Sequence, residues 1–371
     1  MEREVLFLPF LKMASGHHHV ADTLMEETIK INHDINTSKV DILSYSFGVV
    51  EKMVSSFYMK WIHLFPTSYD RLYYYLAFRN VAKRSRALHY ELLFSSNFQK
   101  LVTRKNPSLL FCTHALPSNI AASLKQRGKL DSVVVNVYTD FFINRVWGIK
   151  GVDYHLVPSL TVKKFLVELG VEEAHIFLTG IPVHHAFQPA PPRKEETGQY
   201  AVLVTGGNMG AGSLENLLPE NSQSSSLQYY ILCGNNEKLY KRLLARKNEH
   251  IIPIPYISSK QQMNELYDKV DAVLTKPGGV TVSECLIKQK PIFVSHALPG
   301  QERINKEELE KHGLMMQLTS DKSVEEQIIS YLENEEAMNL YQQSVGEFHG
   351  HLDKRNLGEI LEEIMEKSIS R

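Results

Sequence analysis

Three consecutive histidines stand in the segment GHHHVADTL, residues 16–24, between a short apolar run and a segment with helical periodicity. Imidazole binds metals and also accepts protons near neutral pH, so the cluster is typical either of a metal site or of a catalytic base. Metal ligands on a helix normally recur at i and i+4, but the residue four positions after His17 is Ala21. The spacing therefore favours a base that accepts a hydroxyl proton, and it predicts no bound metal.

A second chemical signature is the segment LTKPGGVTVSECLIKQKPIFV, residues 274–294. We predict a strand that ends at Thr275, a tight turn from Lys276 to Gly279, and then a helix. Glycines let the backbone approach a ligand closely, and the amides at a helix N-terminus attract anions. The turn therefore predicts a diphosphate site, with Glu284 as an acceptor for ribose hydroxyls. A turn without any ligand is the alternative.

Other glycine turns follow neighbouring predicted strands in the same half of the chain. They stand in VTGGNMGAGS (204–213), LCGNNEKL (232–239) and HALPGQERINKE (296–307). We expect them at the same sheet edge as the PGG turn. The last turn carries polar side chains suited to sugar hydroxyls, at Gln301, Glu302 and Asn305.

The elements that must position these residues alternate between short β-branched runs and helical patterns, which indicates parallel sheets covered by helices. The first series of strands includes EVLFLPF, KVDILSY, PSLLFCTH and SVVVNVYTD, and a second series begins with YAVLVTGG. A segment rich in proline and charge separates the two series and indicates a linker. The sequence thus predicts an α/β protein with two doubly wound domains that face a central cleft.

We place the domain boundaries as follows. The N-terminal domain spans 1–185, the linker 186–199 and the C-terminal domain 200–345. A final helix, within 346–371, is predicted to pack back on the N-terminal domain.

Composition excludes several functional classes. The 371 residues are 43% hydrophobic and 22% charged with a formal net charge of −1, so no basic excess indicates nucleic-acid binding. The segment MEREVLFLPF predicts a first strand rather than a signal peptide, and no apolar run approaches the roughly 20 residues of a spanning helix. The cysteines, Cys112, Cys233 and Cys285, lack CxxC spacing, so we expect neither a disulfide nor zinc.

Residues 55–105 are an insertion rich in Tyr, Phe, Trp, Lys and Arg, with few acidic residues. Aromatic rings beside cations are typical of a membrane interface, where the cations attract anionic lipid. We therefore expect an anionic membrane surface to be bound by four basic residues, Arg79, Lys83, Arg84 and Arg86. The alternative is a helical hairpin that packs its aromatic side chains into the first domain.

Four segments together carry a family resemblance: SGHHHVADTL, VYTDFFINRVW, LTGIPVHHAF and TKPGGVTVSECLIKQKPIFVSHALPGQERIN. In this order they resemble the monogalactosyldiacylglycerol synthase and processive diacylglycerol glucosyltransferase family. These GT-B glycosyltransferases are related to the lipid II-forming N-acetylglucosaminyltransferase. The similarity runs from about residue 5 to about residue 345, and it implies two Rossmann-like domains with uridine diphosphate held by the C-terminal one.

The resemblance also implies which residues bind the UDP-sugar. They lie at the first strand-to-helix turn and at the glycine turns of the C-terminal half. The set is Gly16, Gly206, Gly207, Cys233, Gly234, Asn235, Asn236, Tyr256, Ile257, Ser258, Lys276, Pro277, Gly278, Gly279, Glu284, Pro299, Gly300, Gln301 and Glu302.

The family's Gly-His pattern falls on Gly16 and His17, which implies that His17 is the base, whereas His18 and His19 have no assigned role. Asp140 matches the family's Thr-Asp and is either a second candidate base or the carboxylate that orients His17. A helix N-cap is the structural alternative for Asp140. Family members commonly carry Arg where this chain has His184, and if that Arg holds the leaving diphosphate, a histidine would do so weakly at neutral pH.

The resemblance implies an inverting transfer of a hexose from a UDP-sugar to diacylglycerol or a glycosyldiacylglycerol. It implies no tightly bound cofactor, with magnesium at most stimulatory, and a cytoplasmic enzyme associated peripherally with the inner face of the cell membrane. Glucose, galactose and N-acetylglucosamine remain open as donor sugars, as do the number of sugars added and the oligomeric state. The alternatives are another lipid-linked or small-molecule acceptor, or a UDP-sugar-binding protein without turnover.

Overall fold

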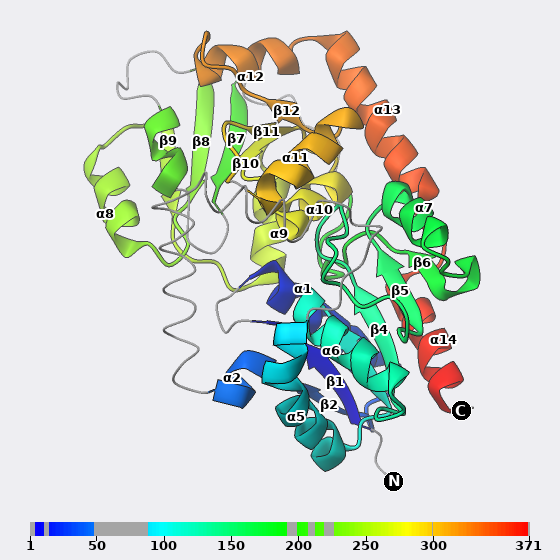
Figure 1. The fold of residues 1–371 in the computed structure, drawn as a ribbon. Helices are drawn as coiled ribbons and strands as arrows, with labels where there is room; N and C mark the ends of the chain where they lie inside the picture. The colour runs from blue at the N-terminus through cyan, green and yellow to red at the C-terminus, as the bar shows by residue number, and fades with distance from the viewer. Residues whose placement is uncertain are drawn as a thin grey trace. The chain divides into compact units, whose positions relative to one another are not determined.

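The computed structural model describes residues 4–10, 15–47, 88–190, 199–206, 212–218, 226–298 and 300–369. They form two compact units (Figure 1). The first unit comprises residues 1–182, 299–301 and 351–371, and the second comprises 183–298 and 302–350.

The first unit contains a six-stranded sheet in the order β2-β1-β3-β4-β5-β6, and every neighbouring pair is parallel. Most of its strands are buried along their whole length, as expected of a parallel sheet covered on both faces. The strands are β1 (Glu4–Leu8), β2 (Asn36–Lys39), β3 (Leu109–Cys112), β4 (Val133–Val137), β5 (Tyr154–Val157) and β6 (Ile176–Leu178).

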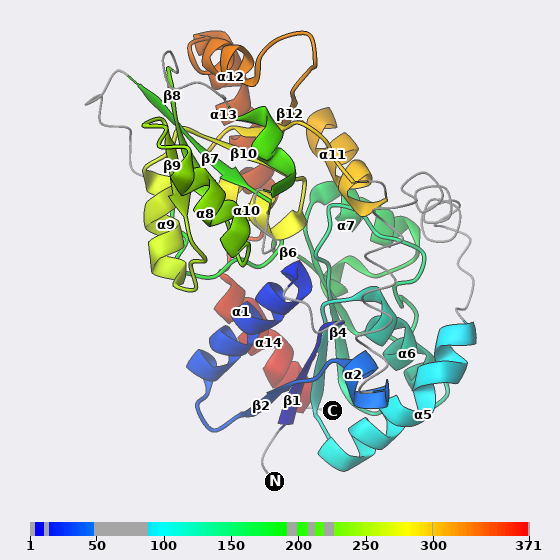
Figure 2. The same ribbon diagram turned by 90° about the vertical axis from the view of Figure 1, so that its left-hand side faces the viewer.

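Helices cover both faces of this sheet. Helices α1 and α14 pack together on one face, and α2, α5 and α6 lie on the other (Figure 2). The helices of the first unit are α1 (Gly16–Ile31), α2 (Ile42–Phe47), α5 (Leu88–Lys105), α6 (Ala115–Gln126), α7 (Leu160–Glu168) and α14 (Leu357–Ile369), and a short 3₁₀ helix spans Glu173–His175.

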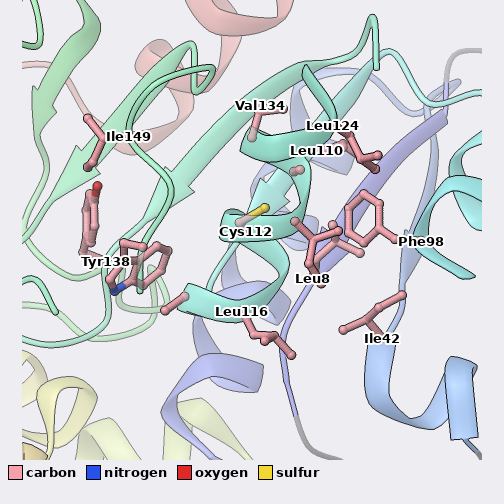
Figure 3. Close-up of a cluster of buried hydrophobic side chains, with 14 of the residues drawn as sticks. Leu8, Ile42, Phe98, Leu110, Cys112, Leu116, Leu124, Val134, Tyr138 and Ile149 are labelled. Atoms are coloured by element: carbon pink, nitrogen blue, oxygen red, sulfur yellow. The ribbon is translucent and has the colours of Figure 1, made fainter. Parts of the chain in front are cut away.

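The core of the first unit lies between the sheet and its helices (Figure 3). Leu8, Leu110 and Val134 come from adjacent strands, and Phe98 from α5 and Leu116 from α6 pack against them. These buried side chains fix the strand ends that carry the first group of candidate site residues.

The second unit repeats the architecture with a parallel sheet in the order β12-β11-β10-β7-β8-β9. Its strands are β7 (Tyr200–Thr205), β8 (Leu227–Leu232), β9 (Ile251–Ile254), β10 (Ala272–Thr275), β11 (Ile292–Val294) and β12 (Met316–Gln317). Its helices are α8 (Glu237–Ala245), α9 (Lys260–Asp268), α10 (Gly279–Ile287), α11 (Gln301–Lys311), α12 (Val324–Leu332) and α13 (Glu335–His351), and a short 3₁₀ helix spans Gly212–Leu217.

The prediction of a strand over KVDILSY was wrong. Strand β2 ends at Lys39, and α2 begins at Ile42. The reason is Asp41, whose carboxylate accepts hydrogen bonds from the backbone N–H groups of Leu43 (2.7 Å) and Ser44 (3.1 Å). This N-cap starts a helix in a segment whose apolar residues resemble those of a strand.

The structure describes only the C-terminal part of the insertion, residues 88–105. Helix α5 forms its C-terminal part, and Phe94, Phe98 and Leu101 of α5 are buried in the core of the first unit. In this part, Phe94 and Phe98 pack into the first unit as the alternative expected, while the predicted hairpin is not tested by the described residues. The four basic residues expected at a membrane, Arg79, Lys83, Arg84 and Arg86, lie outside the described residues.

None of the helices in the described part of the chain combines the length and the apolar character that a bilayer-spanning segment needs.

Candidate active site

In the first unit, candidate residues gather where three adjacent strands end. Helix α1 begins shortly after β1, Thr113 follows β3, and Thr139 and Asp140 follow β4. Strand β1 lies between β2 and β3, so the chain order reverses between β1 and β3. Such a switch point at the carboxyl ends of parallel strands is the usual ligand site of doubly wound sheets.

His17 is fixed at this point by two threonines. Its Nδ1 lies 2.8 Å from the backbone carbonyl of Thr113 and 2.8 Å from Oγ1 of Thr139. The Thr113 hydroxyl in turn donates to the His17 carbonyl at 3.1 Å. Because a carbonyl can only accept, Nδ1 carries the proton in the neutral ring, and Nε2 is then the nitrogen with a lone pair.

The surroundings of His17 favour a neutral imidazole and also place the negative charge of Asp140 near it. Burial lowers the pKa of His17, while the Asp140 carboxylate and the Thr113 carbonyl act in the opposite direction. His17 also makes an edge contact with the His114 ring at 4.8 Å between centroids. Burial lowers the pKa of His114 well below its ordinary value, and the nearby His17 adds to this, so the neighbouring ring is neutral.

The backbone of the other two histidines of the cluster belongs to the first turn of α1. His18 and His19 donate their backbone N–H groups to the carbonyl of Ser15 at 3.0 and 3.2 Å, within the first turn of α1. Gly16 is the first residue of α1. The structure therefore brings His17 and Asp140 together, and the Thr139 hydroxyl contacts the His17 ring.

In the second unit, the PGG turn joins β10 to α10. The Gly278 N–H donates to the Lys276 carbonyl at 2.8 Å, and Gly278 caps α10 with extended backbone. Buried Asn305 donates from Nδ2 to the Pro277 carbonyl at 3.2 Å and so holds the turn in place. A Cβ built on Gly278 would meet no atom of the described chain within 4 Å, so the described residues leave space beside this glycine.

That turn also lies at a switch point. Strand β10 pairs with both β11 and β7, and the chain order reverses between β7 and β10. Gly206 directly follows β7. The carboxyl ends of these two neighbouring strands therefore carry the glycine turn at Gly206 and the PGG turn, as expected of a phosphate site at a helix N-terminus.

Glu284 lies on α10, below the PGG turn. Its Oε2 accepts a hydrogen bond from the Tyr267 hydroxyl at 3.0 Å. Burial raises the pKa of Glu284 to about 7, although Lys260 and the Tyr267 hydroxyl both favour the ionised form. The carboxyl group is therefore an acceptor whose charge changes near neutral pH.

Some of the other predicted binding residues have side chains that are buried or hydrogen-bonded within the protein, and others have side chains exposed to solvent. The Asn236 side chain accepts from the Leu239 N–H at 3.0 Å and caps α8. The Cys233 thiol is fully buried, so any ligand contact at this turn falls to its neighbours and to the backbone. Gly234, with a φ of +54°, makes the turn, and Asn235 is exposed.

The segment after β9 and the turn before α11 complete the predicted set. Tyr256 is 49% exposed, Ser258 is exposed, and Ile257 is partly buried. Glu302 accepts from the Leu298 N–H at 2.7 Å and so closes the turn that contains Gly300, while Gln301 is partly buried. Gly207 and Pro299 lie outside the described residues.

His184, at the position where an arginine was expected, has a local contact. Its Nδ1 accepts a hydrogen bond from the Ala186 N–H at 3.1 Å, and its ring packs against His185 at 4.1 Å between centroids.

Sequence reasoning missed Thr113, Thr139, His114 and Tyr267. The first three share a signal that could have revealed them, because each is a polar residue at the first or second position after an apolar strand of a parallel sheet. Tyr267 lies on α9 and reaches Glu284 only through the packing of α9 on α10, for which the sequence carries no local signal.

Comparison with known proteins agrees with this geometry. Residues 17–183 match the family model for monogalactosyldiacylglycerol (MGDG) synthase, and residues 201–353 match the glycosyltransferase family 28 C-terminal domain. The uncharacterized glycosyltransferase YkoN of Bacillus subtilis (strain 168) is 40% identical over 368 residues, which cover 98% of each chain. The processive diacylglycerol beta-glucosyltransferase of the same strain is 24% identical over 363 residues, covering 95% of this chain and 93% of the relative.

Solved structures share the fold at low sequence identity. Acinetobacter baumannii MurG aligns with a TM-score of 0.59 at 13% identity, over 99% of this chain and 100% of that one. The calicheamicin glycosyltransferase CalG4 aligns with a TM-score of 0.63 at 12% identity, over 100% of this chain and 99% of that one. The chain is therefore a GT-B glycosyltransferase, and it belongs to the monogalactosyldiacylglycerol synthase and processive diacylglycerol glucosyltransferase family.

Proposed function

We propose that this glycosyltransferase moves a hexose from a UDP-sugar to the hydroxyl of diacylglycerol or a glycosyldiacylglycerol, with inversion at the anomeric carbon. The observation that carries the proposal is the fixed tautomer of His17 beside Asp140, because it leaves Nε2 as a base at a switch point. The names of the relatives support the choice of acceptor, since several are processive diacylglycerol beta-glucosyltransferases at 24–27% identity.

In this proposal the first unit supplies the base. Nε2 of His17 takes the proton of the acceptor hydroxyl while the hydroxyl oxygen attacks the anomeric carbon from the face opposite the diphosphate. The bond between the anomeric carbon and the diphosphate oxygen breaks, and UDP leaves with the electron pair. Asp140 stabilises the imidazolium that forms, and the Thr113 carbonyl keeps the ring oriented.

The second unit holds the donor in this proposal. The diphosphate binds at the N-terminus of α10, where the backbone amides and the open space at Gly278 receive the negative charge of the leaving group. The carboxylate of Glu284 accepts hydrogen bonds from the ribose hydroxyls. Tyr256, Ser258 and Gln301 are the solvent-accessible side chains proposed to contact the nucleoside and sugar.

The acceptor lies in a membrane, so we further propose that the enzyme acts at the cytoplasmic face of the cell membrane, which it binds peripherally. The basic and aromatic composition of the insertion at residues 55–105 supports this placement.

The purified enzyme should transfer label from UDP-glucose into the organic phase when diacylglycerol vesicles are present. Parallel reactions with UDP-galactose, UDP-N-acetylglucosamine and ADP-glucose identify the donor, and mass spectrometry counts the sugars added. Label that stays in the aqueous phase on a soluble product would instead indicate a small-molecule acceptor. Binding of UDP without turnover of any donor would contradict the proposal and indicate a binding protein.

A further inference from the structure

Helices α9 and α10 are joined by two polar contacts that the sequence did not reveal. In the first, the Tyr267 hydroxyl donates to Oε2 of Glu284. In the second, one turn further along α10, fully buried Lys288 donates from Nζ to Oδ1 of Asn264 at 2.8 Å and also pairs with Asp268. Both contacts link the helix that carries the PGG turn to the helix before it.

Tyr267 is held rigidly. Its side chain is 1% exposed, and its ring makes an edge contact with Phe187 at 5.9 Å between centroids. A buried phenol hydroxyl requires a hydrogen-bond partner, and here it donates to the Glu284 carboxyl and also contacts the Cys285 thiol. The paired Lys288 also fixes the register of the two helices, so the hydroxyl and the carboxyl meet in one geometry.

We propose that Tyr267 is a positioning residue for Glu284: its hydroxyl holds Oε2, so that Oε1 is presented to the ribose hydroxyls of the bound nucleotide. This inference rests on the proposed function, in which Glu284 binds ribose. It assigns part of the selectivity for ribose to a residue that does not itself touch the ligand.

The arrangement makes nucleotide binding depend on pH. The titratable and charged groups that face Glu284 are Tyr267 and Lys260 of α9 and Cys285 of α10. Ribose hydroxyls bind better to the carboxylate than to the neutral acid, so UDP affinity rises as Glu284 ionises. The Tyr267 hydroxyl favours ionisation, and its removal therefore moves this rise to higher pH.

The test compares Tyr267→Phe with Tyr341→Phe in the full-length protein. Tyr341 is an equally buried tyrosine of the second unit, and its hydroxyl donates to the Lys290 carbonyl at 2.6 Å. Calorimetry measures the affinity for UDP and for 2′-deoxy-UDP across the neutral pH range. Carbon-13 NMR of glutamate-labelled protein, assigned with Glu284→Gln, measures the titration midpoint of Glu284 without any nucleotide.

Tyr267→Phe should weaken UDP binding about tenfold near neutral pH, reduce the preference for UDP over 2′-deoxy-UDP, and raise the Glu284 midpoint. Tyr341→Phe should leave the preference and the midpoint as in the wild type. An unchanged preference and an unchanged midpoint in Tyr267→Phe would overturn the positioning role. A wild-type protein that binds no UDP would overturn the proposed function, while the NMR midpoint would still show whether Tyr267 holds the carboxyl.

Discussion

His17 differs from its two histidine neighbours in what surrounds the ring rather than in residue type. All three lie in the first turn of α1, and in His17 the Thr113 carbonyl and the Thr139 hydroxyl hold Nδ1. A single oriented imidazole is sufficient for general base catalysis, and it needs no metal partner. The family's Gly-His pattern already pointed to His17, and the contacts of its Nδ1 with two strand ends are the structural observation that supports this choice.

We therefore expect His17→Ala to lower turnover by about 10²–10⁴-fold, as is typical for the loss of a general base. The affinity for UDP should stay nearly unchanged, because the proposed diphosphate and ribose contacts, at the PGG turn and Glu284, lie in the second unit. Steady-state kinetics and calorimetry measure the two effects separately.

Alanine at His18 and His19 provides the matched control for His17→Ala, and both variants should be mild. Treatment with a chelator should leave wild-type activity largely intact. Equal loss of activity in all three variants, with activity removed by the chelator and restored by zinc, would show that GHHHV is a metal site.

Glu284 should make the stability of the protein depend on pH. Its pKa rises from the model-compound value of 4.5 to about 7 in the folded protein, chiefly through burial. Between these values the folded state binds more protons than the unfolded state, so its contribution to stability falls as the pH rises through this window. Glu284→Gln removes the titration and should stabilise the protein near pH 8 by up to about 3 kcal/mol, but not near pH 4.

Thermal unfolding of Glu284→Gln and wild type across this pH range measures the effect. A difference in melting temperature that stays constant from low to high pH would show that Glu284 titrates as an ordinary surface carboxyl.

At the scale of elements, the segment that follows Asp140 packs against α6, and the backbone of Gly148 lies very close to the backbone of that helix. The Gly148 N–H donates to Oγ of Ser118 at 3.0 Å, and its carbonyl accepts from Asn136 at 2.8 Å. A Cβ on Gly148 would lie 2.5 Å from the Ala122 Cβ and 2.6 Å from the Ser118 carbonyl oxygen. Only glycine fits here without a shift of the backbone.

Gly148→Ala should therefore cost about 3 kcal/mol of stability. It should also lower turnover, because the added methyl group would displace the segment that begins at Asp140. Gly128→Ala is the matched control: its φ of +65° strains an alanine, but no atom of the described chain lies within 4 Å of the added Cβ. The control should cost about 1 kcal/mol and keep normal turnover. Chemical denaturation and steady-state assays compare the two, and equal effects would contradict a packing role for Gly148.

Elements were predictable from the sequence where periodicity and turn chemistry agree. Strand β10 and helix α10 follow from an apolar run, a PGG turn and a helical pattern. The segment KVDILSY failed because the Asp41 cap outweighs an apolar pattern shared by strands and helices. Contacts between elements, such as Tyr267 with Glu284, depend on how two helices pack, and no local pattern encodes them.

At the scale of the whole molecule, the repetition of one doubly wound pattern predicted two parallel sheets, and the structure contains them. The return of the chain's end to the first unit is a long-range feature: α14 packs on α1, and the Asp353 N–H donates to the Leu178 carbonyl at 2.8 Å. In each unit the main candidate residues lie at the point where the strand order reverses. The sheet order therefore explains why the histidine cluster and the PGG turn stand at places where doubly wound sheets usually bind ligands.

The proposed membrane association belongs to the scale of the whole molecule, and its expected origin is the insertion at residues 55–105. Helix α5 buries Phe94, Phe98 and Leu101 in the core of the first unit, so these side chains are not available for a membrane contact. Replacement of Arg79, Lys83, Arg84 and Arg86 by Glu should weaken binding to anionic vesicles by about 1 kcal/mol per charge, and salt should weaken wild-type binding. Vesicle sedimentation at increasing salt measures both effects, with neutral vesicles as the control. Binding that ignores salt, or a charge-reversed variant that binds as the wild type does, would place the contact elsewhere on the protein.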